Sequence, residues 1–304
     1  MMTPPPTPDR PEKAPATAPM TTRRAVLAWI SVTHPLDDAV VKIARDMGAR
    51  PGSAAVLFDI DGVLAPIVAN ARDARVPDET LDLLARLTGR YLLVGAISGR
   101  GLADVDRMVP VPGIARGGNH GLEVAGPGEV HHLVPEAEAG VAAVRTFVSG
   151  LTDAVLAPRG VWMEDKGPSV SLHFREAPDR DAAEAYLRDE VAPAARAAGL
   201  RTRGGKMILE LLPDADVDKG TALRTLVRGS GARAVLYVGD DRTDADAWRS
   251  MRAMRDAGEI DAAHCVVADG PEVDPSVSDA ADAGVDGPAG VRNLMRALVS
   301  PPDG

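Results

Sequence analysis

Short, continuous apolar runs recur along this chain and end on acidic, glycine or serine residues. Residues 54–58, 91–97 and 234–238 have the length of strands and contain almost no polar side chains. Runs without alternation are typical of strands buried on both faces of a parallel sheet. A stretch of helical spacing, residues 221–227, precedes the last of these runs. The pattern predicts an α/β fold built on a doubly wound parallel sheet.

The pattern changes between residues 136 and 213. Apolar residues at helical spacing predict a helix over about 136–157. Residues 161–166 and 169–174 alternate in polarity around Gly167-Pro168, which predicts a hairpin. The other elements expected here are a helical stretch over 179–198 that Pro193 interrupts, and strands over 200–203 and 207–212 that complete a βαβ-like set.

These elements predict a core with an inserted module. The α/β cap is expected at 136–213, and the core at 36–135 and 214–304. Residues 1–35 are expected to be a disordered tail, because the first part is rich in Pro, Thr and Ala and has no apolar period. A small sheet backed by helices would act as a lid that excludes water and selects the substrate.

Two carboxylates, Asp59 and Asp61, follow the first apolar run, and Gly62 then turns the chain. Residues two positions apart at a strand end reach the same edge of a sheet. Ligands of open parallel sheets bind outside the carboxyl ends of the strands, so this edge is the expected site. For this short motif alone, a solvated turn or a calcium loop remains an alternative.

Three further clusters complete a recognisable set. They are Ser98-Gly99-Arg100 after the second apolar run, Asp218-Lys219-Gly220 before the amphipathic stretch, and Gly239-Asp240-Asp241-Arg242-Thr243-Asp244 after the third run. In this order the motifs resemble the haloacid dehalogenase superfamily of phosphotransferases. The resemblance implies a Rossmann-like core that transfers phosphoryl groups, a reaction catalysed by positioning and by neutralising negative charge.

Each of the acidic residues has its own expected role in the reaction. Asp59 is the candidate nucleophile and would form an aspartyl-phosphate. Asp61 would protonate the leaving sugar oxygen and later activate water. Asp240, with Asp59 and the backbone carbonyl of Asp61, would hold Mg²⁺, because oxygen ligands suit a hard cation better than zinc.

The phosphate itself needs donors and positive charge. Ser98 lies where a strand passes into a helix, so its hydroxyl and the N–H of Gly99 could hold phosphate oxygens. Lys219 would supply a positive charge to the same phosphate. Asp241 and Asp244 are expected either to orient Lys219 or a metal-bound water, or to bind the metal directly.

Residues in and just before the insertion narrow the resemblance to trehalose-6-phosphate phosphatases, over about residues 54–298. The motifs that carry it are Gly118-Asn119-His120-Gly121-Leu122-Glu123, Glu164-Asp165-Lys166-Gly167, Ser169-Val170-Ser171-Leu172-His173-Phe174-Arg175 and Gly205-Lys206-Met207-Ile208-Leu209-Glu210. The family implies that charged groups of the cap hold the hydroxyls of a disaccharide, which suits a neutral polyol that needs short, directional hydrogen bonds.

The same resemblance assigns residues to that task. Glu164, Lys166 and Glu210 would bind the sugar hydroxyls. His120 and its loop, with Asn119 and Glu123, would line the passage between core and cap and contact the substrate. Arg100 would support the phosphate pocket.

The expected activity is Mg²⁺-dependent hydrolysis of trehalose 6-phosphate to trehalose and phosphate. Phosphatases of sucrose 6-phosphate, mannosyl-3-phosphoglycerate or glucosyl-3-phosphoglycerate are the alternatives within enzymes. A phospho-accepting receiver domain also uses strand-end Asp residues, Mg²⁺, a hydroxyl residue and a Lys. However, it has no cap-sized insertion and no second Asp two positions after the acceptor. A module that only senses the sugar phosphate is the remaining alternative.

Composition excludes several partners. The formal net charge is −10 and no basic stripe occurs, so neither nucleic acid nor an anionic membrane is an expected partner. No apolar run approaches the roughly 20 residues of a membrane span. The single cysteine, Cys265, lies in an apolar run and is expected to be a buried thiol. A cytoplasmic monomer that binds a small disaccharide phosphate is the resulting expectation.

Overall fold

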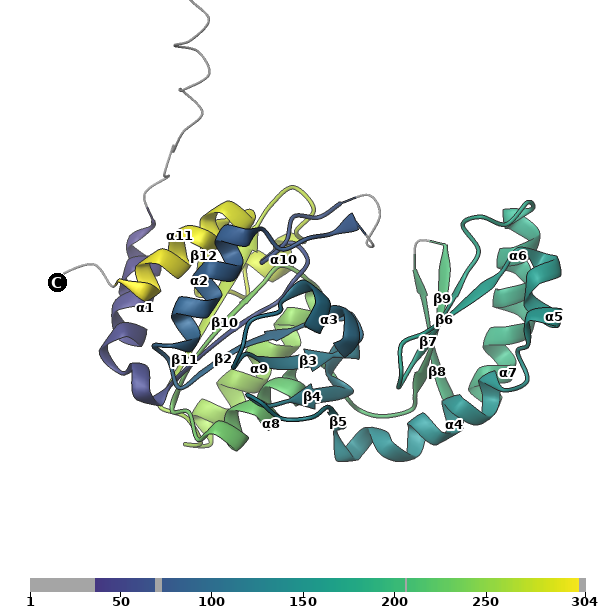
Figure 1. Cartoon of the computed structure of the whole chain (residues 1–304), viewed down its shortest axis with the longest axis horizontal. Coiled ribbons are helices and arrows are strands. Elements are labelled where there is room, and N and C mark those ends of the chain that lie inside the picture. The colour runs from purple at the N-terminus through teal and green to yellow at the C-terminus, as the bar shows by residue number, and fades with distance from the viewer. Residues whose placement is uncertain (1–35, 69–72, 206, 301–304) are drawn as a thin grey trace, which may run out of the picture. The chain divides into compact units, whose positions relative to one another are not determined.

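The computed structural model describes residues 36–68, 73–205 and 207–300, and they contain two β-sheets (Figure 1). The tail predicted at 1–35 lies outside these residues. In spatial order the larger sheet consists of β12 (Ala283–Asp286), β11 (Ala262–Asp269), β10 (Ala234–Gly239), β1 (Ala54–Phe58), β2 (Leu93–Ile97), β3 (Ala115–Gly118), β4 (Glu123–Ala125) and β5 (His132–Leu133).

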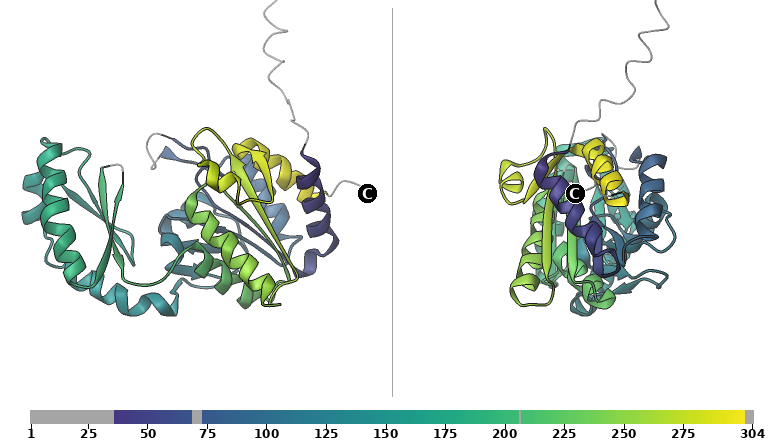
Figure 2. Two further views of the ribbon diagram at one scale, coloured as in Figure 1. Left: turned by 180° about the vertical axis from the view of Figure 1, so that it is seen from behind. Right: turned by 90° about the vertical axis from the view of Figure 1, so that its left-hand side faces the viewer.

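Neighbouring strands from β12 to β3 are parallel, and only β4 and β5 join the edge in antiparallel orientation. Helices cover both faces, so the predicted doubly wound core is confirmed (Figures 1 and 2). One face carries α1 (Asp38–Ala49), α2 (Asp78–Thr88), α3 (Leu102–Met108) and α11 (Gly287–Val299), and the other carries α8 (Lys219–Ser230), α9 (Arg242–Asp256) and α10 (Pro275–Ser278).

The two faces explain why the strand sequences are continuously apolar. In β1, Val56 and Phe58 pack into the core on one side, and Leu57 packs into the core on the other. A strand between two helical layers buries every side chain, so no polar position is left. Cys265 in β11 is fully buried as predicted, and burial together with the nearby charge of Asp282 raises the pKa of its thiol to about 12.

The smaller sheet lies within the segment predicted as a cap. In spatial order it consists of β6 (Trp162–Asp165), β7 (Val170–His173), β9 (Ile208–Pro213) and β8 (Leu200–Gly205). All neighbours are antiparallel, so β7 and β8 run parallel with β9 between them. The predicted hairpin and the predicted βαβ-like connection are both present.

Helices back one face of this sheet (Figure 1). They are α4 (Glu138–Val148), α5 (Asp153–Leu156), α6 (Arg180–Tyr186), a π-helical turn at Leu187–Val191 and α7 (Ala192–Ala197). Val170 and Leu172 of β7 pack against them. The alternate residues Ser171 and His173 therefore point to the opposite face, which none of the helices in the described residues covers.

The helix predicted over 136–157 is wrong in its extent. The chain leaves α4 after Val148, turns through residues 149–152, and restarts at α5. Gly150 weakens the helix, and Thr152 is extended (φ −74°, ψ 162°) as the residue that begins α5. The apolar period continues across the break because Val148 and Leu156 both reach the cap core.

The predicted interruption at Pro193 is also wrong. Helix α6, the π-helical turn and α7 follow each other without a gap. Pro193 lies in the first turn of α7, and the adjacent π-helical turn changes the local hydrogen-bond pattern, so the missing N–H does not end the helix.

Short 3₁₀ turns join several elements, at Pro51–Ser53, Asn119–Gly121, Pro135–Ala137 and Ala157–Arg159. Within the described ranges no single helix is long and apolar enough to cross a membrane, although the pair Pro135–Val148 and Asp153–Arg159, bent by 62°, satisfies length and composition when taken together.

Candidate active site

The carboxyl ends of β1, β2 and β10 meet at one edge of the large sheet. Phe58 is in register with Ala96 of β2 and with Val238 of β10, so the residues that follow these strands lie side by side. The N–H of Asp59 donates to the carbonyl of Val238 at 2.9 Å, which extends the pairing by one residue. This edge therefore collects Asp59, Ser98 and Asp240 from three distant segments.

Gly62 permits the close approach between the two acidic segments. Its φ is +81°, in the left-handed region that favours glycine. A Cβ added at residue 62 would lie 1.9 Å from Oδ2 of Asp240. Any side chain here would push Asp240 away from the turn that carries Asp59 and Asp61, so the Asp-x-Asp-Gly pattern also has a steric basis.

Lys219 is the buried positive charge of the site. Its Nζ lies 3.0 Å from Oδ2 of Asp59, 2.7 Å from Oδ1 of Asp244 and 3.8 Å from Oδ1 of Asp241. The side chain is only 2% exposed. Burial alone would lower the pKa of Lys219, but the charges of Asp244 and Asp59 raise it above its usual range.

Asp244 is completely buried, and both of its oxygens already accept hydrogen bonds. Oδ1 accepts from Lys219 Nζ and from the hydroxyl of Tyr237, each at 2.7 Å. Oδ2 accepts from the N–H groups of Asp240 at 2.9 Å and Asp241 at 3.1 Å. Asp244 therefore orients Lys219 and the start of α9, and it has little capacity left to bind a metal.

The remaining acids fit a divalent metal. Among the described residues, Asp59, Asp240 and Asp244 form an acidic group that could hold a metal ion. Their ligand atoms all lie within 4.8 Å of one another. Because Asp244 is saturated, Asp59 and Asp240 are the side chains that can turn to a cation. A set made only of carboxylate oxygens suits a hard divalent ion.

Repulsion between these acids also favours a bound divalent cation. Burial, followed by the charges of Asp244 and Asp241, raises the pKa of Asp240 to about 7. Burial also raises the pKa of Asp59 well above its usual range, although Lys219 opposes that shift. A divalent cation between Asp59 and Asp240 would relieve this repulsion and keep both acids ionised.

Asp61 is engaged by Arg100. Nε and Nη2 of Arg100 donate to the two oxygens of Asp61 at 2.6 and 2.7 Å, a bidentate ion pair. Ser98 is 1% exposed, and its Oγ accepts from the N–H of Arg100 at 3.2 Å. Ser98, Gly99 and Arg100 thus lie beside the acidic turn, as the sequence predicted.

The loop at Asn119 and His120 connects this edge to the cap. Both residues have positive φ values, +50° and +56°, an uncommon conformation for residues other than glycine. The Asn119 amide donates to Glu123 Oε2 at 2.6 Å and to the carbonyl of Lys166 at 2.9 Å. Its Oδ1 accepts from Ser169 Oγ at 3.0 Å. Asn119 and Glu123 therefore tie the loop to the cap, and neither side chain lines the large cavity.

A cluster of charges crosses the uncovered face of the cap sheet. Glu210 accepts from Lys166 Nζ at 3.1 Å and from Arg203 Nε at 2.7 Å. Arg203 also reaches Nε2 of His120 at 2.6 Å. Glu210 lies behind these two cations, while Glu164 and Lys166 line the cavity itself.

His120 is held neutral by this arrangement. Burial and the charge of Arg203 lower the pKa of His120 from 6.5 to about 4. Its ring fills the space beside Gly99, where an added Cβ would lie 2.4 Å from Cε1. Since an arginine donates to Nε2, the proton of the neutral ring is on Nδ1, which has no hydrogen-bond partner among the described residues.

We expect His120 to make the protein acid-sensitive. A histidine whose pKa is lower in the folded state contributes stability above its unfolded pKa of about 6.5, and that contribution is lost as the pH falls towards about 4. In urea unfolding, the change in stability from pH 7 to pH 4 should be less favourable in the wild-type protein than in His120→Gln by about 1–3 kcal/mol. The raised pKa values of Asp59 and Asp240 act in the opposite direction in both proteins and cancel in this comparison. His132→Gln, at an exposed histidine, is the matched control and should leave the wild-type slope unchanged. An identical slope in His120→Gln would contradict a neutral His120.

A cavity of about 1180 Å³ lies over the sheet edge that carries Asp59 and Asp240, and it extends along the cap. The predicted residues that line it are Asp59, Asp61, Ser98, Gly99, Arg100, His120, Glu164, Lys166, Lys219, Asp240 and Asp241. Asp244 and Glu210 do not line it, but they bind the lining residues Lys219 and Lys166. The cavity is also lined by Trp162, His173, Ile208 and Arg175, to which the sequence motifs assign no role. Period-two alternation predicts His173 on the polar face of its strand. Its neighbour across the sheet, Trp162, is known only from the register between β6 and β7.

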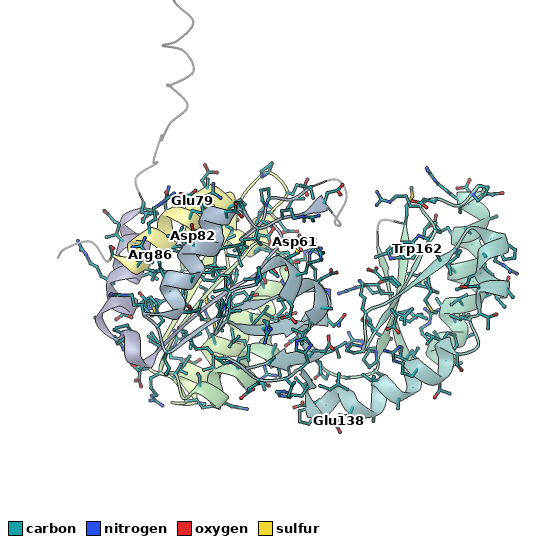
Figure 3. All side chains as sticks on the ribbon, viewed as in Figure 1. Asp61, Glu79, Asp82, Arg86, Glu138 and Trp162 are labelled. Atoms are coloured by element: carbon teal, nitrogen blue, oxygen red, sulfur yellow. The ribbon has the colours of Figure 1, made fainter. Side chains whose placement is uncertain are left out.

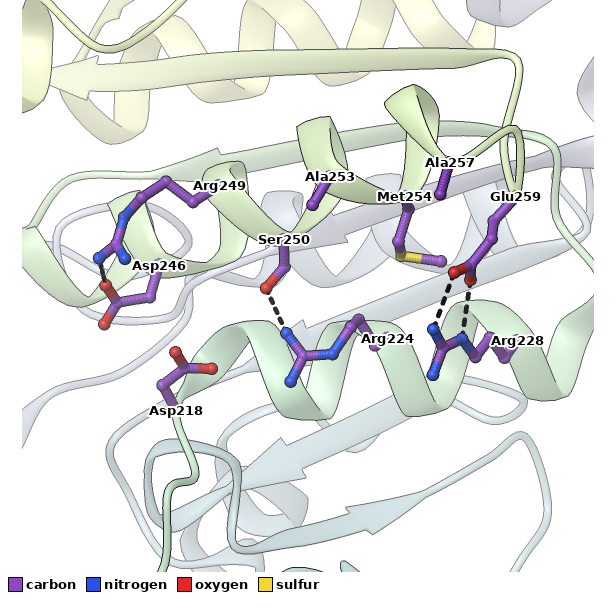
Figure 4. A pocket seen from close by; sticks show the side chains of 10 residues that line it. All are labelled: Asp218, Arg224, Arg228, Asp246, Arg249, Ser250, Ala253, Met254, Ala257 and Glu259. Carbon is purple, nitrogen blue, oxygen red and sulfur yellow. Dashed lines mark hydrogen bonds and ion pairs between the residues drawn. The ribbon is translucent and has the colours of Figure 1, made fainter.

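A second, smaller cavity of about 490 Å³ lies between α8 and α9 and contains none of the predicted site residues (Figure 4). Its arginines are paired within it: Arg224 donates to Ser250 at 2.6 Å and Arg228 binds both oxygens of Glu259 at 2.8 and 2.9 Å (Figure 4). Because these donors are already occupied, this cavity is a weaker candidate for binding phosphate than the sheet edge at Asp59.

Comparisons with known proteins agree with this geometry. A family model described as trehalose-phosphatase matches residues 57–278. The trehalose-phosphate phosphatase of Mycobacterium avium (strain 104) is 39% identical over 210 residues, which are 65% of this chain and 51% of that protein. The chain spans about half the length of the curated relatives it matches.

Two solved structures show the same fold. The C-terminal domain of C. albicans trehalose-6-phosphate phosphatase has a TM-score of 0.63 at 20% identity, covering 88% of this chain and 99% of that chain. A haloacid dehalogenase-like hydrolase from Bacteroides thetaiotaomicron has a TM-score of 0.56 at 13% identity, covering 81% of this chain and 99% of that one. At these identities the likeness establishes the core and cap architecture.

Proposed function

This chain belongs to the trehalose-phosphatase family, and from that membership we propose that it hydrolyses trehalose 6-phosphate to trehalose and inorganic phosphate. The observation that carries the proposal is the meeting of Asp59, Asp240 and Lys219 at one sheet edge that opens into a cavity shared with the cap. That edge offers a nucleophile, a metal site and a positive charge to one phosphate. The cavity is large enough for a disaccharide.

We propose Mg²⁺ as the metal, held by Asp59, Asp240 and the backbone carbonyl of Asp61. Two carboxylates leave positions for water and for a phosphate oxygen, which is how Mg²⁺ is usually bound in phosphoryl-transfer sites. When bound, the ion would neutralise the phosphate charge and allow an anionic nucleophile to approach it.

Asp59 attacks the phosphorus atom with a carboxylate oxygen. The bond between phosphorus and the sugar oxygen breaks, and Asp61 gives its proton to the departing sugar oxygen, because an unprotonated alkoxide is a poor leaving group. Trehalose leaves, and the phosphoryl group remains on Asp59. Lys219 and Ser98 hold the phosphoryl oxygens during the transfer.

The second half of the reaction restores the enzyme. Asp61, now ionised, removes a proton from water, and the oxygen of that water attacks phosphorus. The bond between phosphorus and Asp59 breaks, and inorganic phosphate is released. Lys219 stabilises the Asp59 carboxylate that forms again, and Asp244 keeps Lys219 in place.

Arg100 exchanges partners during this cycle. Without substrate its guanidinium holds both oxygens of Asp61. A phosphate that enters the cavity competes for the same donors, so Arg100 can turn to the phosphate and release Asp61. The released Asp61 carboxylate takes a proton from solvent and then faces the leaving oxygen as the acid. The ion pair thus keeps Asp61 ordered before binding.

The cap recognises the sugar in this proposal. Glu164 and Lys166 line the cavity and would bind hydroxyl groups directly, and Glu210 would fix Lys166 and contact the sugar when the lid closes. His120 would line the passage beside this loop, and Asn119 and Glu123 would hold the loop against the cap. A sugar that leaves one of these charges unpaired is rejected because burying that charge is costly.

A phosphate-release assay tests the proposal. After treatment with EDTA the protein should release no phosphate, and Mg²⁺ should restore the activity. With Mg²⁺, kcat/KM for trehalose 6-phosphate should exceed that for sucrose 6-phosphate, mannosyl-3-phosphoglycerate and glucosyl-3-phosphoglycerate by at least about tenfold. If a rival substrate is cleaved equally well, the substrate assignment fails while the phosphatase chemistry stands; metal-independent hydrolysis would defeat the proposed chemistry.

A further inference from the structure

The uncovered face of the cap sheet is arranged in two neighbouring rows of side chains. The strand register aligns Glu164 with Ser171, Ser171 with Glu210, and Glu210 with Arg203. This polar row contains three of the charged groups of the cap. Residues two positions away on the same strands form the next row on the same face.

That next row is formed by Trp162, His173 and Ile208. All three side chains line the large cavity. The rings of Trp162 and His173 are stacked, with their centroids 4.0 Å apart and their planes inclined by 7°. Trp162 is labelled on the small sheet in Figure 3.

The stacked pair is also joined to the polar row. Nε2 of His173 lies 2.7 Å from Oε2 of Glu164. The hydrogen bond fixes the imidazole ring, and the stacking then holds the indole parallel to it. Trp162 is therefore a rigid aromatic surface beside a carboxylate that faces the same cavity.

We propose that Trp162 and His173 form a sugar-stacking platform that selects substrates with a second sugar ring. Pyranose rings have an apolar face of C–H groups bordered by hydroxyls. A rigid aromatic ring can cover that face while the neighbouring carboxylate accepts from the hydroxyls, which matches the adjacent aromatic and polar rows. This inference rests on the proposed function.

The position of the platform assigns it to the ring farther from the phosphate. The carbonyl of Lys166, just beyond the end of β6, is bonded to Asn119 of the core loop, and the ring of His120 packs against Gly99 beside Ser98. Trp162 is four residues earlier on the same strand, roughly 13 Å from that end. The aromatic row thus lies beyond the polar row, away from the loop that borders the phosphate pocket.

Steady-state kinetics of Trp162 variants test the platform. In Trp162→Ala, kcat/KM for trehalose 6-phosphate should fall about tenfold, mainly through a higher KM, because the lost contact is made in both ground and transition states. Hydrolysis of glucose 6-phosphate, which has no second ring, should change less than about twofold. Trp162→Phe keeps an aromatic face and should retain most of the wild-type kcat/KM.

Met163→Ala is the matched control, since Met163 is the next residue of β6 and points to the other face of the sheet. It should leave both substrates unaffected. Equal losses of kcat/KM on both substrates in Trp162→Ala, or an unchanged KM for trehalose 6-phosphate, would overturn the platform. Wild-type protein that fails to hydrolyse trehalose 6-phosphate would instead overturn the proposed function.

Binding of trehalose itself gives a readout that does not depend on turnover. The indole of Trp162 should change its fluorescence when trehalose is added to the full chain with Mg²⁺, and Trp162→Phe should remove that change. Trp248 is fully buried and stays as an internal reference. A trehalose-dependent change that persists at full size in Trp162→Phe would exclude stacking at this position.

Discussion

Asp59→Asn should lower kcat by about 10⁴-fold or more, because an amide oxygen cannot form the phosphorylated intermediate. The folded state should survive. Burial already raises the pKa of Asp59, so a neutral group of the same shape suits the position, and Lys219 keeps its bond to Asp244. Phosphate release gives kcat, and circular dichroism with thermal unfolding checks the fold.

Asp38→Asn is the control for this experiment. Asp38 is an exposed residue in the first turn of α1, and the same chemical change there should leave kcat at the wild-type value. Full activity in Asp59→Asn would show that another group attacks the phosphate, and Asp61 would be the next candidate.

Among the variants proposed for this protein, Lys219→Met should lower the free energy of unfolding the most. The substitution keeps most of the volume but leaves the buried carboxylates of Asp59 and Asp244 without their positive partner. Removing one partner of a buried ion pair typically costs about 3–5 kcal/mol. The free energy of unfolding in urea, measured without divalent metal, should fall by that amount, and phosphate release should be lost as well.

Two variants separate charge from packing at this site. Lys42→Met makes the same change at an exposed residue of α1 and should alter the stability by less than about 0.5 kcal/mol. The double variant Lys219→Met with Asp244→Asn removes one of the stranded charges and should recover part of the lost stability. If the double variant is no more stable than Lys219→Met, the loss comes from packing.

The sheet edge could be predicted because each of its strands has a clear signal in the local sequence. Continuous apolar runs end on Asp59, Ser98 and Gly239, and the parallel sheet brings such ends together without further information. The burial of Lys219 among Asp59 and Asp244 needed the packed structure, since it depends on how α8 and α9 lie against the sheet.

The cap was harder to predict for two physical reasons. Side-chain neighbours across antiparallel strands depend on register, and one turn sets that register, so the stacking of Trp162 on His173 could not be read from sequence. The break after Val148 was missed because the apolar period runs through it. Asn119 has its amide groups committed to joining loop and cap, a role that spacing does not reveal.

The pairing of β1 with β10 determines when activity can arise during synthesis. Every residue of the cap separates these two neighbours along the chain, so closing that long loop precedes formation of the acidic cluster. A nascent polypeptide that has emerged only through β9 carries Asp59 and all four strands of the small sheet but lacks Lys219 and Asp240. Under the proposed mechanism, hydrolysis therefore requires a chain that extends through β10 to Asp240, and translation products that end before Lys219 should be inactive towards phosphoesters.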